Sequence, residues 1–164
     1  MNKIFWTKKH GTYCSQGKLY LIDLMLLHIN NNKLIPYQLN MSILMPQLND
    51  VGYGGISPMQ VINDRSVSID DYDRMVFSDL RYPIILDTNL RVVDGSHRLG
   101  WSYMLNKKFI DVHIFNKTLM EKFVIEEKKV KRRWVESDWD YYNSLSMKDI
   151  DVLYEKRFYH IMER

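Results

Sequence analysis

The segment Tyr82–Phe115 constrains the fold of this chain more than any other stretch. Its residue types predict a strand over 84–86, a turn, a second strand over 91–93, a helix from Ser96 and a further strand over 111–115. Strand and helix signals that alternate in this way are typical of an α/β protein.

A compact polar loop, Asp94-Gly95-Ser96-His97-Arg98, interrupts this otherwise apolar segment. Gly95 has no Cβ, so the backbone can turn sharply or approach a ligand there. A helix that begins directly after a strand presents unpaired N–H groups and the positive end of its dipole, which together favour an anion. Arg98 adds a planar donor fork suited to phosphate, and Asp94 could orient a metal ion or take a proton from a hydroxyl.

The same loop also has a purely structural interpretation. Asp94 would then cap the helix, Arg98 would pair with a carboxylate, and His97 would pack without a chemical role. Gly100, inside the expected helix, costs about 1 kcal/mol relative to Ala, and close helix–sheet packing is one reason for a glycine there. Short Gly-containing loops are common, so spacing alone leaves both interpretations open.

The run YPIIL…RVVDGSHRLGWSYML resembles the ParB/sulfiredoxin superfamily, in which a strand pair leads into a phosphate-binding helix. The resemblance covers residues 57–115 and is closest to stand-alone ParB-like proteins. It implies a single α/β domain, a small mixed β-sheet flanked by helices, with an added C-terminal helix. It also implies a nucleotide whose phosphates lie against the loop and the helix start.

Residue by residue, the resemblance assigns phosphate contacts to Gly95, Ser96, His97 and Arg98. His97 would touch a phosphate or the transferring group. Asp94 matches the acidic residue that free-serine kinases use near the transferred phosphoryl group, and it could hold Mg²⁺. The implied ligand is ATP, ADP or CTP with Mg²⁺. The implied reaction is phosphoryl transfer to an unidentified acceptor, such as a small hydroxyl-bearing molecule, or hydrolysis, with positioning and charge neutralisation supplying the rate.

Two positions depart from the superfamily pattern. Ser96 stands where sulfiredoxins carry a reactive Cys, and the only cysteine, Cys14, is distant in sequence, which argues against sulfiredoxin chemistry. In the superfamily an early strand lies beside the nucleotide, and in the kinases an acidic residue near it acts as base. The matching stretch LIPYQLN offers only Gln38 and Asn40, which argues against serine-kinase chemistry and is compatible with a site that binds without catalysis.

Length and composition set the outer limits. A chain of 164 residues with 46% hydrophobic content predicts one domain over 1–133 and a helical appendage over 134–164 packed on it. One cysteine excludes an internal disulfide, and the scattered histidines predict no zinc site. No apolar run approaches the roughly 18–20 residues that span a membrane. We therefore expect a cytoplasmic protein in a reducing, intracellular setting.

The net charge of +3 is mild for a nucleic-acid-binding protein. Residues 117–133 hold seven basic and three acidic side chains, and one end of this run could contact nucleic acid or another polyanion: Lys128, Lys129, Lys131, Arg132 and Arg133. A solvated helix or strand edge also explains the run. Further on, an amphipathic stripe over 150–161 would either dock on the core or form a homodimer or partner contact.

The remaining apolar patterns predict four more features. They are a helix over 19–29, a strand over 34–39 at a sheet edge because it contains a proline, a short helix over 41–48, and a helix that begins after Ser68 as its N-cap. The glycine-rich stretch 49–58 is either a linker or a lid.

Three functions fit these observations. The leading one is a nucleotide-dependent phosphotransferase, such as a kinase, or an NTPase. The chief rival is a non-catalytic module on the same fold that binds nucleic acid or a protein. A nuclease ranks third, because the sequence has no carboxylate cluster that would hold two metal ions.

Overall fold

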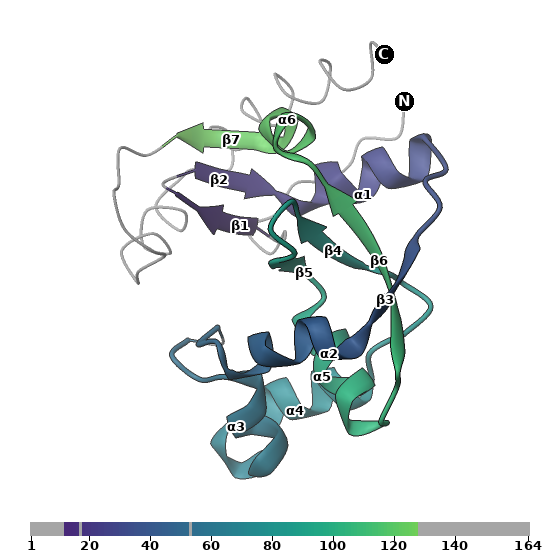
Figure 1. The fold of residues 1–164 in the computed structure, drawn as a ribbon. Helices are drawn as coiled ribbons and strands as arrows, with labels where there is room; N and C mark the ends of the chain where they lie inside the picture. The colour runs from purple at the N-terminus through teal and green to yellow at the C-terminus, as the bar shows by residue number, and fades with distance from the viewer. Residues whose placement is uncertain (1–11, 17, 53, 128–164) are drawn as a thin grey trace. The chain divides into compact units, whose positions relative to one another are not determined.

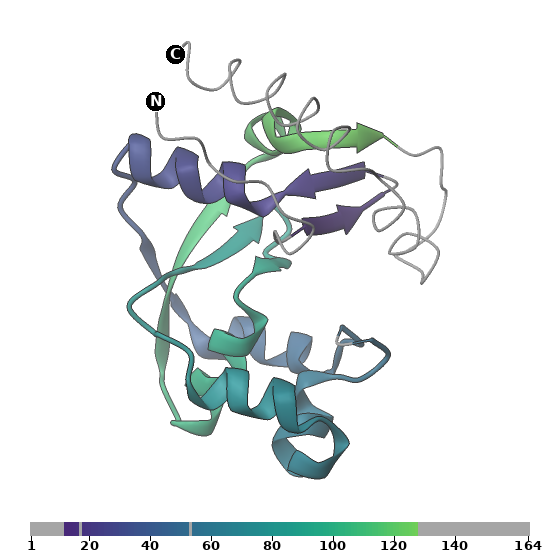
Figure 2. The same cartoon turned by 180° about the vertical axis from the view of Figure 1, so that it is seen from behind.

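The computed structural model describes residues 12–16, 18–52 and 54–127, which belong to two compact units (Figures 1 and 2). We call residues 34–116 the central unit, and residues 1–33 with 117–164 the terminal unit. The predicted domain boundary at 133/134, the basic residues 128–133 and the C-terminal stripe lie outside the described residues.

The described part of the terminal unit contains a three-stranded antiparallel sheet in the order β1-β2-β7. Its elements are β1 (Thr12–Ser15), β2 (Lys18–Leu21), α1 (Ile22–Asn31), α6 (Lys117–Met120), the 3₁₀ helix η3 (Glu121–Phe123) and β7 (Val124–Glu127). Cys14 lies in β1. Lys18 of β2 holds both carboxylate oxygens of Glu121 at 2.8 Å.

The prediction of one helix over 19–29 is wrong in its first turn. Residues 18–21 form strand β2, which pairs with β1 on one side and β7 on the other, and the helix begins only at Ile22. A nearly continuous apolar run fits a buried strand and a buried helix alike, so the pairing with distant β7 decides the outcome. The helix ends at Asn31, two residues beyond the predicted end.

The central unit is a mixed four-stranded sheet with helices, which confirms the α/β class and the small mixed sheet (Figure 1). The strand order is β3-β6-β4-β5, with β4 parallel to β6 and the other two pairings antiparallel. Its elements are β3 (Tyr37–Asn40), α2 (Met41–Leu44), η1 (Met45–Asn49), α3 (Pro58–Asn63), η2 (Arg65–Val67), α4 (Ile69–Val76), β4 (Ile84–Asp87), β5 (Val92–Asp94), α5 (Ser96–Met104) and β6 (Phe109–Phe115).

One face of this sheet packs against α2, η1 and α5. The apolar cluster between them comprises Met41, Leu44, Leu48, Ile84, Leu86, Leu99, Ile110 and Val112. The strand predicted over 34–39 begins only at Tyr37, so Pro36 lies just before β3; the predicted edge position is confirmed. The predicted helix over 41–48 begins at Met41 but tightens to a 3₁₀ helix at Met45, where Pro46 has no N–H to donate.

The β4–β5 hairpin is held at its turn from two sides. Asp87 Oδ1 accepts the N–H groups of Asn89 and Arg91. On the outer edge of β5, the Gln47 amide donates to the Leu90 carbonyl at 2.6 Å and accepts the Val92 N–H at 2.9 Å. The Gln47 side chain therefore makes the two backbone hydrogen bonds, to Leu90 and Val92, that a neighbouring strand would otherwise make. These bonds hold β5, the strand that leads into the polar loop.

Candidate functional site

Gly95 makes the junction between β5 and α5. Its φ of 102° and ψ of 24° lie in the left-handed region, and it occupies the N-cap position without a side-chain cap. A Cβ at this position would lie 2.8 Å from Arg98 Nη2 and 3.0 Å from Ile84 Cγ1. The backbone conformation therefore favours glycine, and a side chain here would force Arg98 and Ile84 to shift.

Arg98, in the first turn of α5, folds back over this glycine. Its Nη2 donates to Asp94 Oδ2 at 2.8 Å and reaches the Pro83 carbonyl at 3.4 Å, while its buried Nε has no hydrogen-bond partner. About a quarter of each side chain in the pair is exposed, 21% for Arg98 and 29% for Asp94. The structural expectation that Arg98 pairs with a carboxylate is thus confirmed, whereas the expectation that Asp94 caps the helix is wrong, because Gly95 is the N-cap.

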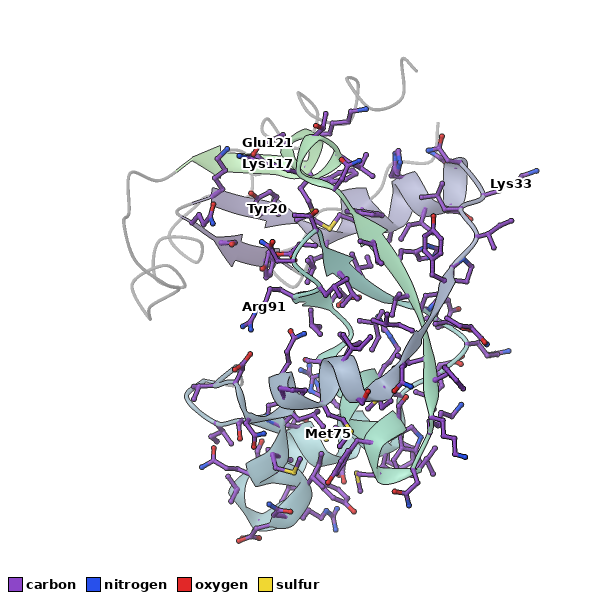
Figure 3. All side chains as sticks on the ribbon, in the orientation of Figure 1. Tyr20, Lys33, Met75, Arg91, Lys117 and Glu121 are labelled. Atoms are coloured by element: carbon purple, nitrogen blue, oxygen red, sulfur yellow. The ribbon has the colours of Figure 1, made fainter. Side chains whose placement is uncertain are left out.

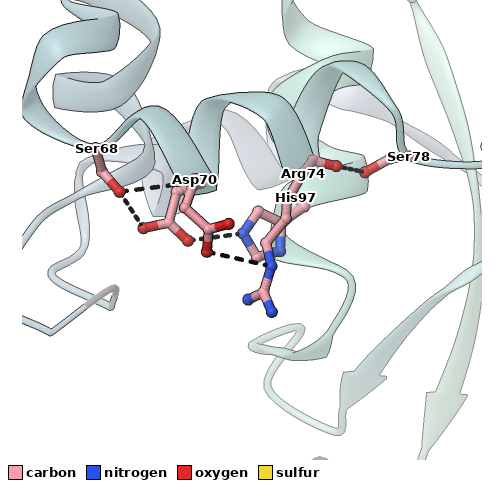
Figure 4. A network of polar contacts seen from close by, with 6 residues as sticks. Ser68, Asp70, Arg74, Ser78 and His97 are labelled. Carbon is pink, nitrogen blue, oxygen red and sulfur yellow. Dashed lines mark hydrogen bonds and ion pairs between the residues drawn. The ribbon is translucent and has the colours of Figure 1, made fainter.

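His97 is held by a residue that the sequence analysis had not assigned to the site. Its Nε2 lies 3.1 Å from Asp71 Oδ1 in the first turn of α4 (Figure 4). A carboxylate can only accept, so Nε2 carries the proton in this contact. The other oxygen of Asp71, Oδ2, accepts from Ser68 Oγ at 2.7 Å.

Ser68 is the N-cap of α4, as predicted, and accepts the Asp71 N–H. The spacing of Ser68 and Asp71 resembles a capping box, so the sequence predicted only a role for Asp71 in capping α4. The Asp71 carboxylate instead connects the cap to His97 in the next helix. No local pattern could have shown this, since the contact spans 26 residues.

The packing of α4 along α5 explains why Asp71 reaches His97. The two contacts Asp71–His97 and Met75–Gly100 run in the same direction along both helices, so the helices are parallel and their first turns lie together. A Cβ on Gly100 would lie 2.8 Å from Met75 Sδ, and Met75 is fully buried between the helices (Figure 3). The close packing expected at Gly100 is therefore against a helix, not against the sheet.

The charges around the loop are mixed. Arg81 donates hydrogen bonds from Nε and Nη2 to the Asp79 carboxylate and lowers its pKa to about 2. The positive charge of Arg98 lowers this pKa by a smaller amount. Within the described residues, no three His, Cys, Asp or Glu side chains come together as a metal site. Asp94 is therefore the single carboxylate that the polar loop itself supplies for a cation.

Gln38 and Asn40 lie far from this loop. They belong to β3, and strands β6 and β4 separate β3 from β5. At about 4.8 Å per strand, three strand spacings place them some 14 Å from the β5 backbone. Asn40 instead caps α2 by accepting the Ser42 N–H. Strand β3 is therefore not next to β5 in the sheet, although its Leu39 packs against the same apolar cluster as Leu99 of α5.

Charge divides unevenly along the chain. The central unit contains five arginines and two lysines against nine aspartates, whereas the rest of the sequence contains sixteen basic and eleven acidic residues. None of the helices in the described ranges is long and apolar enough to cross a membrane. Comparison with family models, with curated proteins and with solved structures finds no significant match.

Proposed function

We propose that this chain is a ParB/sulfiredoxin-like nucleotide-binding protein that transfers or hydrolyses a phosphoryl group. The phosphates would lie at the first turn of α5, over the residues Gly95, Ser96, His97 and Arg98. The nucleotide would be ATP, ADP or CTP with Mg²⁺, and the acceptor a water or a small hydroxyl-bearing molecule.

One observation carries this proposal. Two side chains that can donate to phosphate, His97 and Arg98, occupy the first turn of a nine-residue helix, and each is held by its own carboxylate. The Arg98 cation at this end of the helix runs against its dipole, which disfavours it in a purely structural role. Facing an anion, these side chains would add to the favourable effect of the helix dipole.

The donors present suit a metal–nucleotide ligand. Arg98 pairs with Asp94 through Nη2 alone, and its Nε has no partner. Asp94 uses Oδ2 for that pair, so Oδ1 can accept from a hydroxyl or contact a cation. Mg²⁺ in proteins is commonly held by one or two carboxylates together with substrate phosphates, and it would neutralise phosphate charge when bound. The nine aspartates of the central unit make such neutralisation necessary for tight binding.

Calorimetric titration of ATP, ADP and CTP with Mg²⁺ tests the proposal. Wild type should bind at least one nucleotide saturably, and Arg98→Ala should weaken binding by about 10- to 100-fold, the value of one or two charge-assisted hydrogen bonds. Arg91→Ala is the matched control, because Arg91 also pairs with an aspartate at 2.8 Å, Asp50, in the same unit (Figure 3). Absence of nucleotide binding by folded wild type would refute the proposal, and so would an equal effect of the control.

The alternative function is a non-catalytic module that binds nucleic acid, and the uneven charge supports it. The basic residues concentrate outside the central unit, at positions that include 128–133. In this case DNA or RNA affinity should fall steeply with salt, and replacing Lys128, Lys129 and Lys131 with Glu should abolish it while Arg98→Ala leaves it unchanged.

A further inference from the structure

We infer that Asp71 is a positioning residue for the phosphate site, acting through His97. The inference rests on the proposed function and adds a component from a different helix. Asp71 Oδ1 accepts from His97 Nε2 at 3.1 Å, and the Asp71 side chain is only 17% exposed. This contact fixes which ring nitrogen carries the proton and the direction in which the imidazole faces.

Asp71 is itself held in place. Ser68 Oγ donates to Asp71 Oδ2 at 2.7 Å, so both carboxylate oxygens are engaged (Figure 4). The parallel packing of α4 along α5, locked by Met75 against Gly100, sets the separation of the two first turns. A chain from Ser68 through Asp71 to His97 therefore orients the imidazole from a rigid element, as a preorganised site requires.

The Arg98 side chain is arranged in the same way. Arg98 is held by Asp94 from the strand side, and His97 is held by Asp71 from the helix side. The two donors of the first turn thus each have a carboxylate support, and these supports come from β5 and α4. Holding His97 is a role for Asp71 that capping α4 does not explain.

Whether removing Asp71 weakens or tightens ligand binding distinguishes a positioning role from a simple charge effect. Asp71 is an anion close to the place proposed for phosphate, so as a bystander it would repel the ligand, and its removal would tighten binding. If Asp71 positions His97, its removal weakens binding. Asp70→Asn is the matched control: Asp70 is the adjacent first-turn carboxylate, and it contacts Arg74 at 3.6 Å (Figure 4).

The test is a double-mutant cycle on nucleotide affinity. We expect Asp71→Ala and His97→Ala each to weaken binding by about tenfold, a typical loss for one hydrogen bond to a charged group. In the His97→Ala background, Asp71→Ala should have no further effect. Asp70→Asn should leave affinity unchanged or slightly increased. Asp71→Asn, which keeps the acceptor oxygen and the cap spacing, should stay within about threefold of wild type and covers the case in which the Ala variant does not fold.

Two results would overturn the inference: Asp71→Ala weakening binding equally with and without His97, or Asp70→Asn weakening it as much as Asp71→Ala. A ligand-free measurement distinguishes this failure from failure of the proposed function. In ¹⁵N-labelled protein the His97 Nε2 proton should exchange slowly with solvent, and it should exchange rapidly in Asp71→Ala. Slow exchange without nucleotide binding by wild type would refute the proposed function while keeping the Asp71–His97 pair, whereas fast exchange in wild type would refute the pair itself.

Discussion

Gly95→Ala is the substitution that tests most directly how the polar loop is built. Alanine at a φ of 102° costs about 1–2 kcal/mol, because its Cβ crowds the following carbonyl. The new Cβ would also lie 2.8 Å from Arg98 Nη2 and 3.0 Å from Ile84 Cγ1. The end of the Arg98 side chain has to move, and a move that breaks its bond to Asp94 adds about 1–2 kcal/mol; the fully buried Ile84 has to give by a few tenths of an ångström. We expect a total loss of about 2–4 kcal/mol in the free energy of unfolding.

The chain offers a control for the backbone contribution. Gly55 has a φ of 101°, almost the same as Gly95, but a Cβ there would meet nothing within 4 Å. Gly55→Ala should therefore cost only the backbone term, about 1–2 kcal/mol or less where its loop relaxes. The difference between the two variants measures the contact of residue 95 with Arg98 and Ile84.

Urea denaturation followed by far-UV circular dichroism gives both losses. In an Arg98→Ala background, the extra cost of Gly95→Ala should shrink, since one of the two clashing groups is absent. Equal losses for Gly95→Ala and Gly55→Ala would refute the claim that the loop and Arg98 are packed as described. An unchanged loss in the Arg98→Ala background would assign the whole contact to Ile84.

Two further predictions concern the hairpin and the pH dependence of stability. Gln47→Ala should lower the free energy of unfolding by about 2 kcal/mol, because the Leu90 carbonyl and the Val92 N–H both lose a partner; Gln47→Glu should be at least as costly at neutral pH in urea denaturation, since the carboxylate cannot donate. Burial lowers the pKa of His113, and burial together with Lys122 lowers that of His28. The unfolded chain therefore takes up protons first as the pH falls below about 6.5, and stability should decline there by up to about 1.4 kcal/mol per pH unit for each histidine. His113→Gln should flatten the profile measured between pH 7.5 and 5, and an unchanged slope would show that His113 is not the group responsible.

The outline of the central unit could be predicted from the sequence because its signals are local. Ser68 precedes an amphipathic helix, Pro36 immediately precedes the edge strand β3, and the apolar runs around the Asp87 turn give a hairpin. Each of these depends on residues within a few positions of one another. Strand β2 could not be predicted in this way, because its second partner, β7, lies more than a hundred residues away.

The same limit applies to the candidate site. The Asp94–Gly95–Arg98 arrangement lies within five residues, so the loop and the ion pair could be anticipated from spacing. Asp71 could not, because it meets His97 only through the parallel packing of α4 on α5. A residue that supports a site from another element carries no local signal of that role.

The two carboxylates decide how the positive end of α5 behaves. Arg98 at a helix N-terminus opposes the dipole, and Asp94 offsets that cost in the folded chain, while Asp71 holds the His97 imidazole. In the proposed function, a phosphate would share these donors with the carboxylates, so part of its interaction energy would be spent on reorganising the Arg98–Asp94 and His97–Asp71 contacts. This competition predicts modest nucleotide affinity without Mg²⁺, since the metal reduces the repulsion between phosphate and the aspartates. If the proposed site binds a nucleotide, the supports that orient the donors should therefore also make binding depend on Mg²⁺.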